Sequence, residues 1–129
     1  MNTGAAEEWL KHAEADLHYA RLGQKDSEAM ESLIAFHAEQ AVEKSMKAVL
    51  VRHHVEFPKT HDLEHLLELI EDAGVLWPPG LNRVLELTPF ATHARYPGFD
   101  DPITRTEVDE AIAMAERVLE WAGKEIPKD

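Results

Sequence analysis

The sequence has no cysteine, and its 129 residues contain no apolar run near the length of about 18 residues that a membrane-spanning helix needs. Without cysteine, disulfides and thiolate metal sites are excluded, and the cytoplasm is the expected compartment. The first residues show no charged-then-apolar leader of the kind that directs export. We therefore expect a cytoplasmic protein that does not associate with a membrane.

Basic residues are scarce, because 13 lysines and arginines stand against 25 acidic residues, for a net charge of -12. A protein of this sign repels phosphate backbones, so DNA binding is not expected. Residues 44–61 depart from this balance, since they carry one acidic residue, Glu56, and four basic residues: Lys44, Lys47, Arg52 and Lys59. This local excess fits either a compact anion site or an intramolecular salt-bridge face.

The composition that remains, 44% hydrophobic and 29% charged, is typical of one folded domain over residues 1–129 with a core from about 5 to 123. Residues 29–55 contain no glycine or proline and predict one long helix. Its apolar stripe is wider than a surface helix needs, so we expect neighbours on more than one side. Polar residues interrupt that stripe and are the first candidates for a functional site: Glu39, Gln40, Glu43, Lys44 and Lys47.

Helical spacing of apolar residues also predicts a first helix over residues 5–22, with Gly23 as its stop. Either Asp26 or Ser27 is expected to cap the long helix that follows. A short loop between two long helices makes them antiparallel neighbours.

Three further helices are predicted after the break at Pro58. Thr60 is the expected N-cap of the first of them, which Gly74 closes, and a shorter helix covers residues 81–93 with a kink or break at Pro89. A capping box of Thr104 and Glu107 opens the last helix, which runs to residue 122. The predicted fold is all-α, an antiparallel up-and-down bundle of four to five helices.

Three motifs in this order resemble the HEPN domain family: FHAEQAVEKSMKAVL, FPKTHDLEHLL and ARYPG, after an opening helix of the form WL..AEADL..A. The resemblance covers roughly residues 7–121. It implies an antiparallel helix bundle that commonly forms a homodimer. It also implies pairing with a small nucleotidyltransferase encoded beside it, often as a toxin–antitoxin couple. We expect no cofactor.

Many members of that family are metal-independent ribonucleases, whose signature is an arginine followed a few residues later by a histidine near the final helix. No histidine follows Arg95 or Arg105 here, and Arg83 precedes His93 by ten positions. The chain therefore resembles a branch without the catalytic pair. The alternative is a ribonuclease with a non-standard site around His93 and Arg95, which would serve as base and cation.

Arg95 lies in an irregular segment next to Tyr96. Its guanidinium can offer a planar fork to a phosphate or a carboxylate, while Tyr96 can stack on a base or pack on a dimer partner. The alternative is that Arg95 pairs with Asp100, Asp101 or Glu43 and holds the segment to the bundle.

Lys59 and the helix N-terminus after Thr60 favour an anion. Alternatively, Thr60 and Asp62 cap that helix, and His61 hydrogen-bonds the long helix. The ligand-binding residues that we predict, in a polar cleft beside the long helix, are Arg95, Tyr96, Lys59, His61, Gln40 and Lys44.

Other polar residues have simpler interpretations. Glu43 and Lys47 stand four apart, in the favourable order for an ion pair, and the polar residues of the long helix form either a seam that fixes its register or a dimer interface. His37 is expected to be a hydrogen-bonded core histidine. His61 and His65 fit the H-x-x-E-H zinc-peptidase pattern, but that pattern needs a further carboxylate within a larger enzyme, so we predict no metal.

Together with what the resemblance implies, these observations predict a nucleotide-binding or partner-binding subunit that is associated with a small nucleotidyltransferase and lacks the ribonuclease signature. Its expected ligand is a nucleotide, an RNA phosphate or a loop of a protein partner.

Overall fold

The computed structural model of the chain describes residues 3–93 and 102–127. Every regular element in these two ranges is helical, in the order α1 (Thr3–Gln24), α2 (Glu31–Arg52), α3 (Leu63–Asp72), the 3-10 helix η1 (Asn82–Leu87), α4 (Phe90–His93) and α5 (Arg105–Glu125). None of the described helices has the length and apolarity to cross a membrane.

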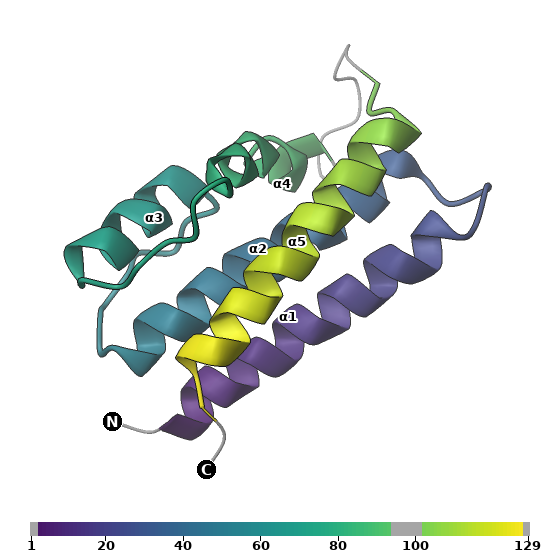
Figure 1. Cartoon of the computed structure of the whole chain (residues 1–129). Coiled ribbons are helices and arrows are strands. Elements are labelled where there is room, and N and C mark those ends of the chain that lie inside the picture. Colours follow the sequence, from purple (N-terminus) through teal and green to yellow (C-terminus); the bar gives the residue numbers. More distant parts are fainter. Residues whose placement is uncertain (1–2, 94–101, 128–129) are drawn as a thin grey trace.

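The three long helices α1, α2 and α5 lie side by side, and α3, η1 and α4 pack along another side of α2 (Figure 1). Helix α2 contacts all the other helices and is the centre of the bundle. This arrangement confirms the all-α antiparallel bundle expected from the sequence.

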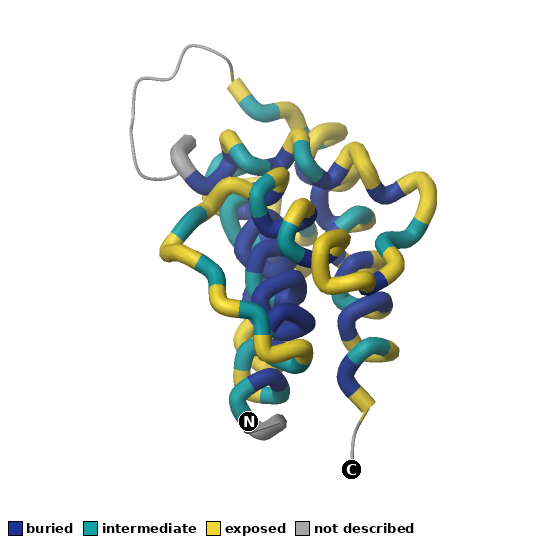
Figure 2. Tube along the Cα trace, turned by 90° about the vertical axis from the view of Figure 1, so that its left-hand side faces the viewer, coloured by how far each residue is buried: buried dark blue, intermediate teal, exposed yellow. Residues whose placement is uncertain are grey.

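Burial follows that central position, because 14 of the 22 residues of α2 are buried. In Figure 2 the central helix is mostly buried, whereas the outer turns of the other helices are exposed. The wide apolar stripe thus has the neighbours on several sides that its width predicts. Polar residues that fall on α2 are consequently carried into the interior, and this places the candidate site.

The hairpin of α1 and α2 is tighter than the sequence predicts. Helix α1 does not stop at Gly23 but continues to Gln24, and a Cβ at Gly23 would lie 2.7 Å from Cγ1 of Ile34. Gly23 is therefore needed for the close approach of the two helices and does not end α1. The expected caps are also wrong, because Met30 is the N-cap of α2 and has no side-chain hydrogen bond, while Asp26 accepts from the amide of Glu28.

A residue from the far end of the chain closes this hairpin. Arg105, the first residue of α5, donates from Nη1 to the carbonyls of Gly23 and Gln24, and from Nη2 to those of Asp26 and Ala29. Its Nε lies 3.1 Å from a carboxylate oxygen of Glu31. The guanidinium thus satisfies backbone acceptors at the turn that no side chain of the hairpin itself serves.

Helix α3 begins at Leu63, with Asp62 as its N-cap in place of the predicted Thr60. The hydroxyl of Thr60 instead accepts from the amide of Asp62 at 3.0 Å and shapes the approach to the helix. Gly74 follows the helix with a φ of 80°, as expected for a residue that ends a helix in the left-handed region.

The predicted helix over residues 81–93 is two pieces, η1 and α4, with Pro89 in the turn between them. Proline has no amide hydrogen to continue an α-helix, which explains the break. The capping box of Thr104 and Glu107 is confirmed. Helix α5 continues past Gly123, since a glycine inside a helix costs only about 1 kcal/mol relative to alanine.

Candidate functional site

Several polar side chains of α2 are buried in the core: Glu39, Gln40, Glu43, Ser45 and Lys47. A buried polar or charged group costs several kcal/mol unless hydrogen bonds or an opposite charge compensate it. Ser45 is satisfied locally, because its hydroxyl donates to the carbonyl of Ala41 at 2.7 Å. The other four side chains are organised around a single carboxylate.

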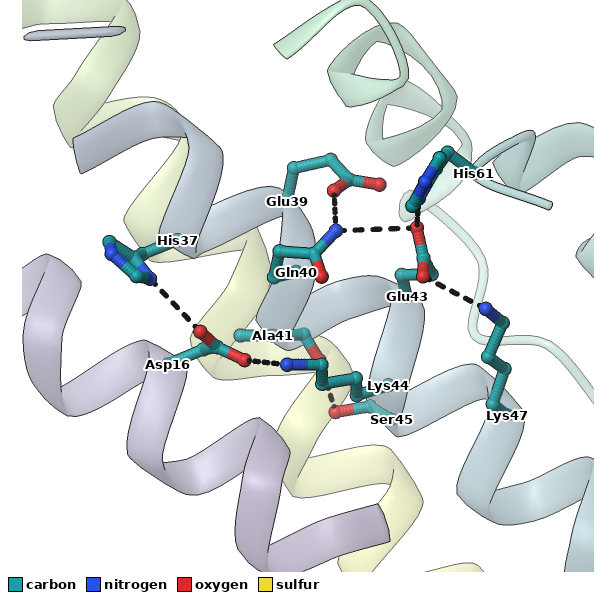
Figure 3. A network of polar contacts seen from close by, with 10 residues as sticks. All are labelled: Asp16, His37, Glu39, Gln40, Ala41, Glu43, Lys44, Ser45, Lys47 and His61. Carbon is teal, nitrogen blue, oxygen red and sulfur yellow. Dashed lines mark hydrogen bonds and ion pairs between the residues drawn. The ribbon is translucent and has the colours of Figure 1, made fainter. Parts of the chain in front are cut away.

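That carboxylate is Glu43, whose side chain is only 4% exposed. One oxygen accepts from Lys47 Nζ at 2.9 Å, and the other accepts from His61 Nδ1 at 2.8 Å and from Gln40 Nε2 at 3.4 Å (Figure 3). The ion pair predicted from the spacing of Glu43 and Lys47 is confirmed. We call Glu39, Gln40, Glu43, Lys47 and His61 the Glu43 cluster.

Lys47 receives a second kind of stabilisation. Its ammonium lies 5.7 Å from the ring centroid of Trp9 and 5.6 Å from that of Phe57. The two rings contact each other edge to face, with centroids 6.0 Å apart. Ring faces attract a cation, most strongly where water is excluded. Lys47 therefore links the aromatic contact between α1 and the segment after α2 to the buried carboxylate.

Glu39 is fully buried beside this group, and its Oε1 accepts from Gln40 Nε2 at 2.7 Å. Burial, reinforced by the charge of Glu43, raises the pKa of Glu39 to about 9. Glu39 consequently keeps its proton at neutral pH. Its other oxygen, Oε2, is buried and has no hydrogen-bond partner among the described residues. The cluster therefore contains one charged carboxylate and one neutral carboxylic acid.

His61 is the member of the cluster that reaches water, with 44% of its side chain exposed. Because a carboxylate only accepts, the Nδ1 that faces Glu43 carries the hydrogen. The second ring nitrogen, Nε2, is on the opposite edge of the imidazole and is left for another partner. The turn formed by Thr60 and Asp62 holds His61 in this orientation.

A second carboxylate on the opposite flank of α2 has similar partners. Asp16 of α1 lies 2.9 Å from Nδ1 of His37 and 2.6 Å from Nζ of Lys44 (Figure 3). The side chain of His37 is 35% exposed, and its ring lies against that of Tyr19. His37 is hydrogen-bonded as predicted, but it is half-buried rather than part of the core. We call Asp16, His37 and Lys44 the Asp16 cluster.

The structure brings some predicted ligand-binding residues together and separates others. Gln40 and His61 meet at Glu43, so the alternative in which His61 hydrogen-bonds the long helix is realised. Gln40 is buried and turned inward. Lys44 belongs to the Asp16 cluster. Lys59 is exposed and forms no ion pair in the described part of the chain.

The anion site predicted at the start of α3 is partly filled from within, since Asp62 accepts from the amide of Glu64. His93 ends α4. Arg95 and Tyr96 lie outside the described residues, so their predicted roles and the alternative pairing of Arg95 stay predictions.

Among residues 3–93 and 102–127, no group of three histidines or acidic residues is placed to hold a metal ion. Of the two histidines in the zinc-like pattern, His61 contacts Glu43 and His65 lies 3.8 Å from Glu68.

Sequence reasoning did not identify Asp16 or the neutral state of Glu39. Asp16 falls on the apolar side of α1, beside Leu17 and Ala20. An acidic residue on a buried face is a usable signal, because it requires a partner on the facing helix. The partners themselves, 21 and 28 residues further along the chain, could not be read from local spacing.

A family model described as HEPN domain matches residues 6–126. Among solved structures, the chain is similar to the crystal structure of ST0689, an archaeal HEPN homologue, with 29% identity, a TM-score of 0.72, and coverage of 95% of this chain and 98% of that one. It is also similar to the crystal structure of TT1696 from Thermus thermophilus, with 24% identity, a TM-score of 0.77, and coverage of 97% and 99%, a likeness that concerns the fold alone. No curated protein matches the sequence significantly.

Proposed function

The chain belongs to the HEPN domain family, and from this premise we propose that it is a non-catalytic subunit that associates with a small nucleotidyltransferase and binds a phosphate-bearing ligand at His61. The assembly that we propose is a cytoplasmic homodimer paired with that enzyme, as in a toxin–antitoxin couple.

The observation that carries the proposal is the hydrogen bond from His61 to the buried Glu43. A surface imidazole that is held by a buried carboxylate has a fixed direction, and 44% of the His61 side chain is exposed. When the ring is protonated, both nitrogens donate, and Nε2 can bind a phosphate oxygen. A histidine of this kind binds a ligand without further ordering of its own side chain.

Local charge supports an anion here despite the acidic protein. Lys47 compensates Glu43, and Glu39 is neutral because its pKa is raised to about 9. Lys59, two residues before His61, is exposed and adds an unpaired positive charge within the described residues. Asp62 and Glu64 are also exposed close to His61 in the chain, and solvent screens their charges, so they oppose a phosphate only weakly.

Binding of ATP to the purified protein tests the ligand part of the proposal. We expect saturable binding by calorimetry and at least a fivefold loss of affinity in His61→Ala. The matched control His18→Ala, an exposed histidine of α1, should bind like the wild type. Absence of ATP binding, or equal binding by His61→Ala, would contradict the proposed site.

Association is tested separately by co-expression with a small nucleotidyltransferase encoded beside this chain. We expect a complex that elutes as one species in size-exclusion chromatography. Elution as two separate species would contradict the proposed association. The proposed ligand binding is judged by the ATP experiment alone.

The ribonuclease alternative depends on His93 and Arg95, and no observation on the described residues favours it. Incubation of RNA with the purified protein in the presence of a chelator decides between the two functions. We expect intact RNA, and cleavage that Arg95→Ala abolishes would replace the binding function with an enzymatic one.

A further inference from the structure

A pocket of about 310 Å³ lies between α1 and α2, beside the ring of Trp9. Its lining residues are Ala5, Glu8, Trp9, His12 and Lys44. This volume is within the range of pockets that bind small ligands, and a few polar groups in a partly apolar wall are typical of such sites. Nothing described so far uses it.

The apolar residues that line the pocket are Trp9 and Ala5. Phe57 contacts the indole ring of Trp9 edge to face, and the ammonium of Lys47 lies over it. These contacts hold the ring in place, and Trp9 is at the same time a lining residue of the pocket. A fixed indole is a stacking surface for a flat ligand, because no side-chain freedom is lost on binding.

The cation of the pocket is Lys44. Its side chain is 24% exposed, and its ammonium donates to Asp16 at 2.6 Å (Figure 3). An ammonium has three donor hydrogens, so two remain after this bond. Asp16 is itself held by His37. Lys44 therefore has a fixed position at the pocket with donor capacity to spare.

The rim of the pocket consists of Glu8 and His12, one turn apart on α1 and both exposed. Neither has an ion-pair partner in the described part of the chain. Because Glu8 is exposed, its charge is screened and opposes an anion only weakly. His12 can supply a further hydrogen bond.

We propose that this pocket binds a small flat ring that carries one anionic group, with the ring against Trp9 and the anion on Lys44. The inference goes beyond the proposed function, since it concerns another surface and needs no partner enzyme. Two sources share this chemistry: an aromatic carboxylate and a nucleotide with a single phosphate.

The three tryptophans of the chain permit a direct test on the full-length protein. Each indole N–H gives one peak in a nitrogen-15 correlation spectrum, and Trp9→Phe identifies the peak of Trp9. Indole-3-acetate and adenosine monophosphate are titrated in parallel with their neutral counterparts, indole-3-acetamide and adenosine. We expect one anion to shift the Trp9 peak saturably, with a Kd below about 1 mM, while its neutral counterpart binds at least fivefold more weakly.

Two variants test the charges. Lys44→Gln should weaken binding at least fivefold, and Glu8→Gln should strengthen it up to threefold, with thermal melting as the check that each variant folds. An unmoved Trp9 peak with both anions, equal shifts by the neutral compounds, or weaker binding by Glu8→Gln would overturn the inference. If adenosine monophosphate perturbs His61 and neither anion moves the Trp9 peak, the proposed function stands and this inference fails.

Discussion

The Asp16 cluster and the Glu43 cluster are built from the same parts, since each carboxylate binds one lysine and one histidine. They differ in depth, because the side chain of Asp16 is 11% exposed and its lysine 24%, whereas Glu43 and Lys47 are 4% and 8% exposed. The deeper carboxylate has an additional donor, Gln40, and its acidic neighbour Glu39 is protonated. The deeper ion pair is thus accompanied by an extra donor and by a neutral acidic neighbour, both of which lower the cost of burying its charges.

The two clusters also connect different parts of the fold. Asp16 joins α1 directly to α2, so its bonds tie together two helices that already pack closely. Glu43 joins α2 to the segment before α3 through His61, where packing is less extensive. We infer that the Asp16 cluster mainly aligns two helices and that the Glu43 cluster mainly positions a surface histidine.

The largest expected effect is from Glu43→Ala, which leaves Lys47 buried without its carboxylate. We expect a loss of about 3–5 kcal/mol in the free energy of unfolding, measured with urea. The double variant Glu43→Ala, Lys47→Met should regain part of that loss, because no unpaired charge remains. Glu68→Ala, at an exposed position, is the control and should change stability by less than about 0.5 kcal/mol. A loss below about 1 kcal/mol in Glu43→Ala would erase the distinction between the clusters.

The second prediction concerns pH and Glu39. In the native protein Glu39 keeps its proton up to a pKa of about 9, whereas the ordinary pKa of this group, expected in the unfolded chain, is 4.5. The native state thus binds more protons between these values, so this group's contribution to stability is full below 4.5 and is lost as pH rises toward 9. The slope is at most about 1.4 kcal/mol per pH unit.

Glu39→Gln should remove that slope and be more stable than the wild type at pH 8, as measured by urea unfolding between pH 5 and 9. Glu71→Gln, an exposed carboxylate of α3, is the matched control and should keep the slope of the wild type. If the free energy of unfolding changes with pH in the same way in the wild type and in Glu39→Gln, Glu39 is ionised in the native protein.

Asp16→Ala should have a smaller effect than Glu43→Ala. Its partners Lys44 and His37 both reach water and can be solvated when the carboxylate is removed. We expect a loss of about 1–2 kcal/mol in urea unfolding. Glu14→Ala, an exposed position on the same helix, is the control. A loss as large as that of Glu43→Ala would mean that exposure does not separate the clusters.

The smallest expected effects are those of the two histidines. Each ring makes one hydrogen bond to its carboxylate, so we expect His61→Ala and His37→Ala to lose about 0.5–1.5 kcal/mol in thermal or urea unfolding. His61→Ala should lose more, because it leaves the more buried carboxylate short of a donor. A larger loss in His37→Ala than in His61→Ala would mean that the histidine of the Asp16 cluster contributes more to stability than that of the Glu43 cluster.

The bundle itself was predictable from the sequence, because helical periodicity, the broad apolar stripe of α2 and the capping box of Thr104 are local signals. The ion pair of Glu43 and Lys47 was predictable for the same reason, since residues four apart share a helix face. The sequence also identified α2 as the element that carries the candidate polar residues, because they interrupt its broad apolar stripe.

Apart from the hydrogen bond of His61 to the long helix, which the sequence offered as an alternative, features that depend on distant residues were not predictable. The N-cap of α3 is Asp62 and not the predicted Thr60. Both side chains can accept from a free amide, and only the path of the chain decides which of them caps the helix. The partners of Asp16 and the raised pKa of Glu39 result from tertiary burial, which no local pattern encodes.

Arg105 closes the turn between α1 and α2 from a position more than seventy residues further along the chain. During synthesis on the ribosome, the hairpin therefore emerges long before the group that satisfies its turn carbonyls. The carbonyls of Gly23 and Asp26 already accept from the amides of Asp26 and Ala29, but water must solvate those of Gln24 and Ala29 until α5 leaves the exit tunnel. The order of translation makes the start of α5 the step that completes the first two helices.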